Sequence, residues 1–154
     1  MKYIIFVLIG LLAALVAVAI YVRVAPSKAA LWHNPNVPVM GPGEYPADGA
    51  HLSQRPIEGD GFAQLAALDA IVRATARTSV LAGSVEDAKI TYITRSRVFG
   101  FPNYTTVTLM QLPSTGMSTV QIYSRLRFSK FDMGVNRFRI ENWISQWQPV
   151  RDAQ

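Results

Sequence analysis

Apolar and polar residues alternate differently in three parts of this chain of 154 residues. Residues 3–22 form an apolar run without a charge or a proline. As a helix, such a run reaches about 30 Å, the thickness of a bilayer's hydrocarbon core. We therefore expect a transmembrane anchor over residues 1–23, with the lipid bilayer as the partner of residues 3–22. A cleaved signal peptide is the alternative, because Ala17–Ala19 is a small-x-small triplet, but the apolar run continues beyond it.

The segment after the anchor has no apolar period. Six of the nine prolines fall between Val24 and Gly61, and each proline disfavours helix at the residue before it. We expect a linker or strap over residues 24–59. Part of it should dock on the folded domain, because it contains Trp32, Val37, Val39 and Met40.

Regular periods return in residues 60–148, where we expect the folded domain, followed by a C-terminal tail over 149–154. Apolar residues recur at three-and-four spacing near both ends of this domain, which predicts helices, with Asp60 as the N-cap of the first. Between them, period-two stretches separated by turn-forming residues predict strands. The predicted elements are a helix over 60–77, strands over 89–98, 104–112 and 118–128, and a final helix over 135–147.

Four-residue loops between these strands would set the register of an antiparallel meander, pairing Val98 with Thr105 and Val107 with Ile122. One sheet face then carries Ile90, Tyr92, Val98, Val107, Leu109, Val120, Ile122, Leu126 and Phe128. The other carries Arg95, Arg97, Thr106, Thr108, Gln121, Tyr123, Arg125 and Arg127. The predicted fold class is α+β: an N-terminal transmembrane helix, then a two-layer domain of antiparallel β-meander with helices packed on one face.

The stretches "YITRSRVFGF" and "IYSRLRFSKFDMGVNRFRIENW" resemble the bacterial and plastid family of domain of unknown function 1499. Ser124, Arg125, Arg127, Ser129, Asp132, Gly134, Asn136, Arg137 and Arg139 match its pattern of a serine-arginine strand, a corner and a final helix. Pro102, Asn103 and Tyr104 stand where the family commonly shows two aspartates. The resemblance implies the fold and a membrane-anchored bacterial organisation, and it implies no mechanism.

Charge adds a candidate binding surface. The formal net charge is +5, and residues 88–131 contain six basic residues and no acidic one. We expect Arg95, Arg97, Tyr123, Arg125 and Arg127 to bind an acidic protein, lipid headgroups or a small anion, unless acids elsewhere in the chain pair with them. Nucleic acid is disfavoured, because only Tyr123 could stack on a base there.

The corner before the last helix has two interpretations. As architecture, Asp132 caps the helix, Gly134 takes a backbone conformation that a Cβ opposes, and Asn136 bridges the bend. As a ligand site, the same helix start and the arginines Arg137 and Arg139 capture an anion. The architectural interpretation is favoured, since the carboxylate of Asp132 would repel a second anion.

Catalytic and metal signatures are missing from the sequence. There is no nucleophile elbow, phosphate loop or dinucleotide glycine pattern, and there is no cysteine. His33 and His51 lack a ligand partner at suitable spacing, so we expect exposed loop histidines, no metal and no cofactor.

The leading functional prediction is a non-catalytic accessory or assembly subunit that docks on a larger membrane protein complex through anchor, strap and basic face. The alternative is an enzyme or small-anion sensor around Asp132, Asn136 and the sheet arginines. We place the chain in the bacterial inner membrane as a single-pass protein. Its domain is expected to be periplasmic, because a basic tail as short as Lys2 stays readily in the cytoplasm, although the flanking charges are nearly balanced.

Overall fold

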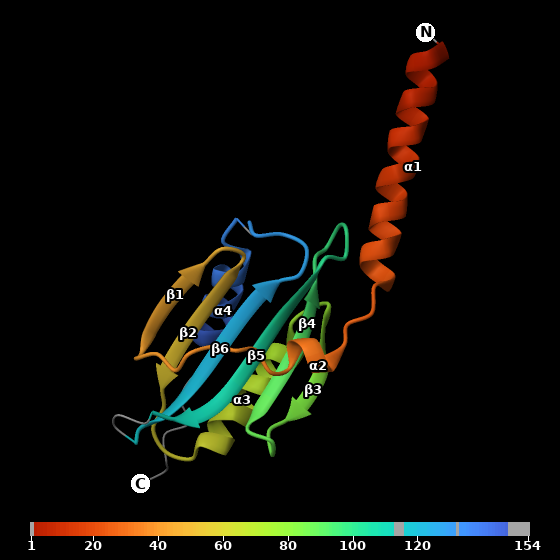
Figure 1. The fold of residues 1–154 in the computed structure, drawn as a ribbon. Coiled ribbons are helices and arrows are strands. Elements are labelled where there is room, and N and C mark those ends of the chain that lie inside the picture. Colours follow the sequence, from red (N-terminus) through yellow and green to blue (C-terminus); the bar gives the residue numbers. More distant parts are fainter. Residues whose placement is uncertain (1, 113–115, 132, 148–154) are drawn as a thin grey trace.

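The computed structural model describes residues 2–112, 116–131 and 133–147, and the tail expected over 149–154 lies outside this range. A long helix stands away from an α+β domain (Figure 1). The elements are α1 (Lys2–Val24), α2 (Ala29–Trp32), β1 (Gly43–Ala47), β2 (Ala50–Pro56), α3 (Gly61–Ala74), β3 (Thr78–Ser84), β4 (Lys89–Arg95), β5 (Pro102–Gln111), β6 (Ser118–Leu126) and α4 (Val135–Gln146).

Helix α1 is long and apolar enough to cross a membrane. Its 23 residues would reach about 35 Å, and nearly all of its side chains are exposed. The prediction of an apolar spanning helix is therefore confirmed. A helix with these properties near the N-terminus can also be a signal sequence. At its lower end Val22 and Ala25 are buried against the domain, and Pro26 follows directly.

The six strands form one antiparallel sheet in the order β1-β2-β6-β5-β4-β3. The meander of β4, β5 and β6 is confirmed, and β5 pairs with β6 as predicted, with Val107 opposite Ile122. The predicted register of β4 and β5 is wrong. Arg95 pairs with Pro102, so Val98 lies in a loop over residues 96–101.

This loop has six residues instead of the expected four, and hydrogen bonds between its end residues, Ser96 and Phe101, close it. Ser96 N donates to Phe101 O at 3.0 Å, and Ser96 Oγ accepts from Phe101 N at 2.9 Å. Gly100 supplies a left-handed backbone conformation with φ of 74°. The shift from the predicted register spans an even number of residues, so the paired side chains keep their predicted faces.

Strands β1, β2 and β3 were not predicted. β1 and β2 lie inside the segment expected to be a linker, so the sheet already begins at Gly43. Pro46 argued against a strand here in the sequence, although an edge strand such as β1 tolerates proline. β2 pairs with β6, which is distant in sequence, so no pattern of neighbouring residues indicates this pairing. β3 lacks a clean alternation because it contains glycine and a register shift after Val80.

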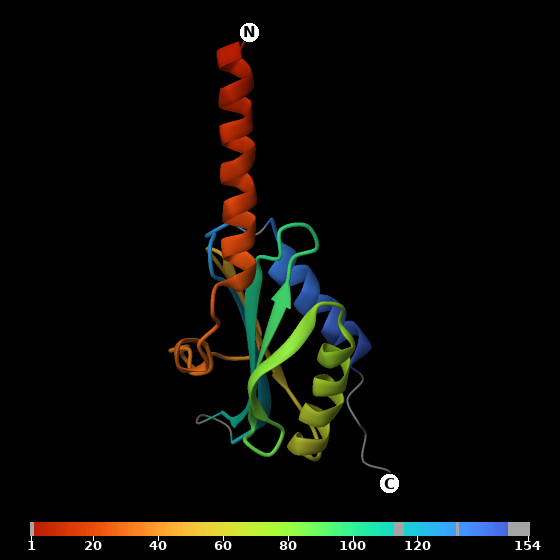
Figure 2. The same cartoon turned by 90° about the vertical axis from the view of Figure 1, so that its right-hand side faces the viewer.

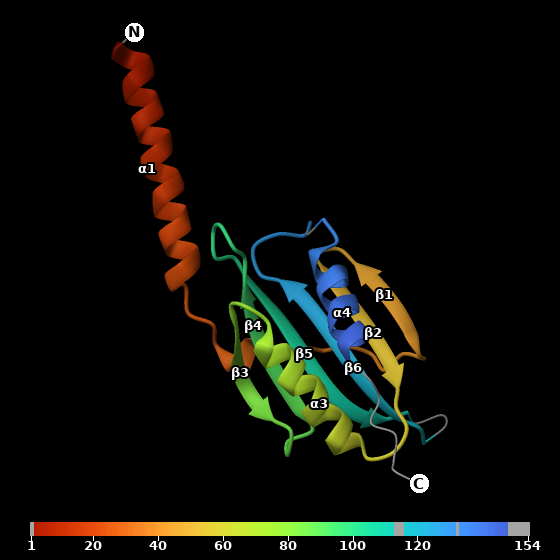
Figure 3. The same cartoon turned by 180° about the vertical axis from the view of Figure 1, so that it is seen from behind.

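Helices α3 and α4 cover one face of the sheet, as Figures 2 and 3 show from the side and from behind. Asp60 caps α3 as predicted, its Oδ1 accepting from Phe62 N at 2.9 Å. The indole of Trp143 donates to Thr75 Oγ1 at 2.8 Å, which joins the two helices. The core consists of Ile57, Leu65, Leu68, Val72, Ile90, Tyr92, Val107, Val120, Ile122, Ile140, Trp143 and Trp147.

Residues 25–42, here called the strap, lie across the opposite face of the sheet (Figure 2). Trp32 stacks on Tyr104 with ring centroids 3.8 Å apart, and Gln121 Nε2 donates to Pro38 O at 3.3 Å. The expectation that part of this segment docks is therefore confirmed. The strap gives the two-layer domain a partial cover on its second face.

Both histidines differ from the expectation of exposed loop residues. His33 is half-buried, with Nδ1 3.0 Å from Thr91 Oγ1. His51 is buried on β2, with Nε2 2.7 Å from Glu44 Oε2. The strap and the unpredicted hairpin create these buried positions. Among the described residues, no group of three or more His, Cys, Asp or Glu side chains could hold a metal.

Candidate functional site

Two connecting segments, the β4–β5 loop (residues 96–101) and the β6–α4 connection (described residues 127–131 and 133–134), lie at the end of the sheet where α1 leaves the domain (Figures 1 and 2). Arg23 Nη2 in the last turn of α1 donates to Val98 O at 2.8 Å. Tyr21 meets Phe128 edge-on, with ring centroids 6.3 Å apart. These contacts place both segments level with the lower end of α1.

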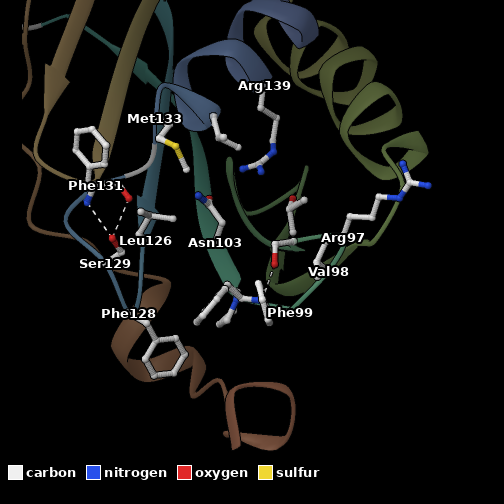
Figure 4. Close-up of a pocket in the computed structure, with 15 residues that line it drawn as sticks. Arg97, Val98, Phe99, Asn103, Leu126, Phe128, Ser129, Phe131, Met133 and Arg139 are labelled. Carbon is white, nitrogen blue, oxygen red and sulfur yellow. Dashed lines mark hydrogen bonds between the residues drawn. The ribbon is translucent and has the colours of Figure 1, made fainter. Parts of the chain in front are cut away.

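The two segments enclose a hollow of about 590 Å³, here called the apolar hollow. Most of its wall is apolar, and Figure 4 shows side chains from both segments around it. The main wall residues are Val98, Phe99, Phe101, Leu126, Phe131 and Met133. Its volume lies within the range of small-molecule sites, about 300–1,000 Å³.

The rim of the apolar hollow is exposed. Val98, Phe131 and Met133 have relative exposures of 69%, 78% and 84%. Large apolar side chains gathered in this way mark sites of interaction with a membrane, a ligand or another protein. Met133 and Gly134 form the turn before α4, and both have positive φ, of 50° and 78°.

A buried network of amides and hydroxyls lies behind the hollow, which Asn103 also lines. Ser124 Oγ lies 2.8 Å from Asn103 Oδ1 and 2.9 Å from Asn136 Oδ1. Thr105 Oγ1 is 2.9 Å from Ser124 Oγ, and Asn103 Nδ2 donates to Asn136 Oδ1. Asn136 Nδ2 donates to Gly49 O at 3.3 Å, which joins α4 to the β1–β2 turn.

This network holds the strands and α4 together. The partners recorded for Ser124 Oγ are amide and hydroxyl oxygens, and neither group is a general base near neutral pH. The network therefore has a structural role. It fixes the wall of the hollow, to which Leu126, Met133 and Val135 contribute side chains.

The predicted corner residues do not converge on one point. Gly134 precedes α4 in a left-handed conformation, and Asn136 belongs to the buried network. Arg137 is exposed and its Nε donates to Glu141 Oε1 at 2.7 Å, whereas Arg139 lines the apolar hollow. Asp132 lies outside the described residues. A ligand site at this corner stays a prediction.

The basic face is not a flat open surface, because the strap crosses it. Arg125 lies between Trp32 and Tyr123, its guanidinium carbon 5.4 Å and 5.1 Å from the two ring centroids. It donates to Trp32 O and, at 3.1 Å, to Thr106 Oγ1. Burial lowers the pKa of Arg125.

The remaining basic residues of this face lie in two different places. Arg127 Nη1 donates to Pro26 O at 3.0 Å, so strap carbonyls hold both Arg125 of β6 and Arg127, which follows it. Arg95 and Arg97 instead lie at the end of the sheet near α1, where Arg95 Nη1 donates to Gly100 O at 3.1 Å. Binding of an acidic partner by these residues stays a prediction, and the strap confines it to the end that carries Arg95 and Arg97.

Sequence reasoning missed part of the apolar wall of the hollow. Val98, Leu126 and Phe128 were predicted on the apolar face of the sheet. The other wall residues stand in "FGF" and "KFDM", stretches interpreted as a turn and a corner. Connecting segments are normally polar, so phenylalanine and methionine there are the signal that could have indicated a site. Their convergence depends on the β4–β5 register, which was predicted wrongly.

Comparison with known proteins gives a family without a described activity. The model of the family "Protein of unknown function (DUF1499)" matches residues 42–146. The match confirms the resemblance carried by the serine-arginine strand and the corner. It begins beside Gly43, the first residue of the sheet, and leaves out α1 and most of the strap. No curated protein matches the chain.

Proposed function

We propose a function for this chain, which belongs to the DUF1499 family of proteins of unknown function: a membrane-anchored domain that takes the acyl chain of a bilayer lipid into its apolar hollow. The observation that carries this proposal is the position of the hollow. It opens beside the last turn of α1, the helix that is apolar enough to span the bilayer. A lipid tail can enter it from the membrane with little passage through water.

The proposal requires that α1 is retained as an anchor. The contacts of α1 with the domain support this requirement, since Val22 is buried and Arg23 donates to the carbonyls of Val98 and Phe99 at 2.8 Å and 3.4 Å. A signal sequence destined for removal needs no such contacts. Cleavage after the Ala17–Ala19 triplet would also detach the domain from the bilayer that supplies the ligand.

The rim is suited to membrane contact because its side chains are apolar and lie level with the end of α1, where the membrane–water interface would be. Transferring apolar groups out of water stabilises binding by about 25 cal/mol per Å², and about 0.8 kcal/mol per CH₂ for an acyl chain. Phe99, Phe128 and Phe131 are large apolar side chains of the kind that interfacial segments insert at the boundary between headgroups and acyl chains. Insertion of this rim would bring the mouth of the hollow to the acyl-chain region.

The proposed location is the bacterial inner membrane, with the domain on the periplasmic side. Lys2 before the apolar run and Arg23 with Lys28 after it nearly balance, so the positive-inside comparison does not oppose this orientation. The lipid-binding proposal itself does not depend on this orientation, because both leaflets offer acyl chains.

Photo-crosslinking tests the proposal with the full-length protein. We would place it in phosphatidylcholine vesicles that contain a lipid with a diazirine at the end of one acyl chain, and map the labelled tryptic peptides by mass spectrometry. Labelling of α1 serves as an internal reference. We expect additional labelling of the peptides spanning 98–125 and 131–137, which carry the wall of the hollow.

Variants separate entry into the hollow from contact with the rim. Leu126→Trp fills the hollow and should abolish labelling of peptide 98–125, and Phe101→Ser should reduce it through the opposite wall. Phe138→Ser is the matched control, because Phe138 is 72% exposed and lies outside the hollow. Labelling of α1 alone in the wild type would contradict the proposal. That outcome would favour the accessory subunit on a larger membrane complex, with the apolar rim as its protein contact.

A further inference from the structure

A second hollow of about 540 Å³ lies against the apolar hollow, here called the arginine hollow. It is lined by Arg23, Arg77, Arg95 and Arg97, together with Thr78, Ser79, Ser96 and Gly100. The four arginines come from α1, the α3–β3 connection, β4 and the β4–β5 loop, so the fold gathers them from distant parts of the chain. Of these four arginines, the basic face predicted from the sequence included Arg95 and Arg97.

The positive charge of this hollow is not neutralised by acids in the described part of the chain. None of the ion pairs between described residues includes any of these four arginines. Their recorded hydrogen bonds go to backbone carbonyls: Arg77 Nε to Arg95 O at 3.2 Å, Arg95 Nη1 to Gly100 O at 3.1 Å, and Arg23 to the carbonyls of residues 98 and 99.

These bonds orient the guanidinium groups and leave donors for a ligand. A guanidinium has five N–H donors in a planar fork that matches the oxygens of a phosphate. Arg77 and Arg95 each use one N–H in the recorded bonds, so most of their donors are available to an anion. The hydroxyl groups of Ser79 and Thr78 add further polar groups to the wall.

The two hollows adjoin each other. Ser96 and Arg97 line both of them, so a ligand that fills the apolar hollow can place a polar head among the arginines. A molecule with a long apolar part and an anionic head fits this pair of sites. Both sites also meet α1, through Arg23 on one side and through Tyr21 against Phe128 on the other.

We propose that the ligand of the adjoining hollows is an anionic phospholipid of the surrounding bilayer, with its phosphate in the arginine hollow and one acyl chain in the apolar hollow. This inference rests on the proposed function, because it assigns the head of the same lipid whose tail occupies the apolar hollow. The occupant is a lipid rather than a free anion because the arginines adjoin an apolar cavity at the membrane interface.

The test compares two diazirine lipids at equal mole fraction in nanodiscs that hold the full-length protein: phosphatidylglycerol, which is anionic, and phosphatidylcholine, whose choline cation offsets the phosphate charge. We would measure labelling of peptide 98–125 relative to α1. The wild type should favour phosphatidylglycerol, with each arginine contributing roughly fivefold, as expected for a basic side chain at an anionic surface.

The diagnostic variant is Arg77→Asn/Arg97→Gln. Asparagine suits position 77 because Arg77 has a positive φ of 60°, which asparagine tolerates. Because Arg97→Gln removes a tryptic site, labelling of this variant is read on peptide 96–125. The double variant should keep its phosphatidylcholine labelling, and the loss of two arginines should lower the preference for phosphatidylglycerol roughly 25-fold. The charge-matched control, Lys130→Gln/Arg137→Gln, removes two positive charges from residues outside both hollows and should keep the wild-type ratio.

The outcomes separate the two proposals. Equal labelling by both lipids in the wild type, with the wall peptide still labelled, would contradict the proposed anionic headgroup. It would not contradict the proposed acyl-chain site. Loss of wall labelling for both lipids would remove the proposed function as well. In phosphatidylcholine nanodiscs, the wild type could instead bind radiolabelled inorganic phosphate and the double arginine variant fail to bind it. That result would assign the arginine hollow to a free anion and contradict the proposal of a lipid headgroup.

Discussion

Trp32 of the strap lies flat on Tyr104 at the centre of the sheet, with ring centroids 3.8 Å apart and ring planes 9° from parallel. The Tyr104 hydroxyl is also 2.6 Å from Ser27 Oγ, so one side chain of β5 meets the strap at two places. The strap connects α1 to the first strand. This stacked pair therefore helps to fix the domain relative to α1.

Replacing Trp32 should release the strap. Trp32→Ala removes the stack on Tyr104 and the ring beside Arg125, and we expect the free energy of unfolding to fall by about 1–3 kcal/mol. Lys28 is exposed in the strap, so tryptic cleavage after Lys28 reports the release directly. Trp32→Phe keeps an aromatic ring and should remain protected. Equal cleavage rates in wild type and Trp32→Ala would show that Trp32 does not hold the strap.

Asn136 should carry much of the stability of the buried network. Asn136→Ala removes the acceptor of Asn103 Nδ2 in a buried region, and an unsatisfied buried donor costs about 1–3 kcal/mol. It also removes one of the bonds of Ser124 Oγ and of Gly49 O. We expect a loss of about 2 kcal/mol, measured by denaturant unfolding of the full-length protein in detergent. Asn142→Ala, at an exposed position of the same helix, should change stability little. Similar losses in the two variants would refute a special role for the network.

Tyr92 predicts a dependence of stability on alkaline pH. Its hydroxyl is buried and donates to Asp69 Oδ1 at 2.7 Å, and burial, followed by this bond, raises the pKa of Tyr92 well above its usual value. Between the unfolded pKa of about 10 and the higher folded pKa, the folded protein binds the proton that the unfolded chain has lost. The free energy of unfolding should therefore fall as pH rises above about 10.

Tyr92→Phe supplies the control for this pH dependence. The variant should be less stable than the wild type at pH 8, because it loses the hydrogen bond to Asp69, and its stability should fall less between pH 10 and 11.5. Parallel curves for the two proteins over that interval would mean that Tyr92 titrates similarly in the folded and unfolded states.

The rim of the apolar hollow should lie within the bilayer. The chain has no cysteine, so single-cysteine variants accept a nitroxide label at one chosen position. Labels at Met133→Cys and Val98→Cys in lipid vesicles should be readily relaxed by oxygen and poorly by a water-soluble nickel complex. Leu31→Cys in the strap, where Leu31 is 71% exposed, should show the opposite. Nickel access at all three sites would place the rim in water.

The sequence predicts most of the layer that packs on the helices. The stripe of Ile140, Trp143 and Trp147, the cap at Asp60 and the pairing of Val107 with Ile122 all depend on local period and on turn residues, which a single sequence records. The pairing of β2 with β6 depends on residues far apart in the chain, such as Leu52 opposite Tyr123, and no local pattern indicates it.

The candidate site was only partly predictable for the same reason. Arg95 and Arg97 were recognised as basic residues of the strand predicted over 89–98, but Arg77 and Arg23 join them only through the folded arrangement of α1 and β3. Arg125 was expected to face a partner, and the chain's own Trp32 carbonyl occupies that place. Phe99 and Phe131 lie in stretches interpreted as turns, where an apolar side chain is easily overlooked.

The most direct test of the central claim is native mass spectrometry of the full-length protein released gently from phospholipid nanodiscs. The account predicts that wild-type protein retains one phospholipid and that Leu126→Trp, which fills the apolar hollow, retains none, while Phe138→Ser retains one. Equal lipid retention by the wild type and a folded Leu126→Trp variant would contradict an acyl-chain site in the apolar hollow.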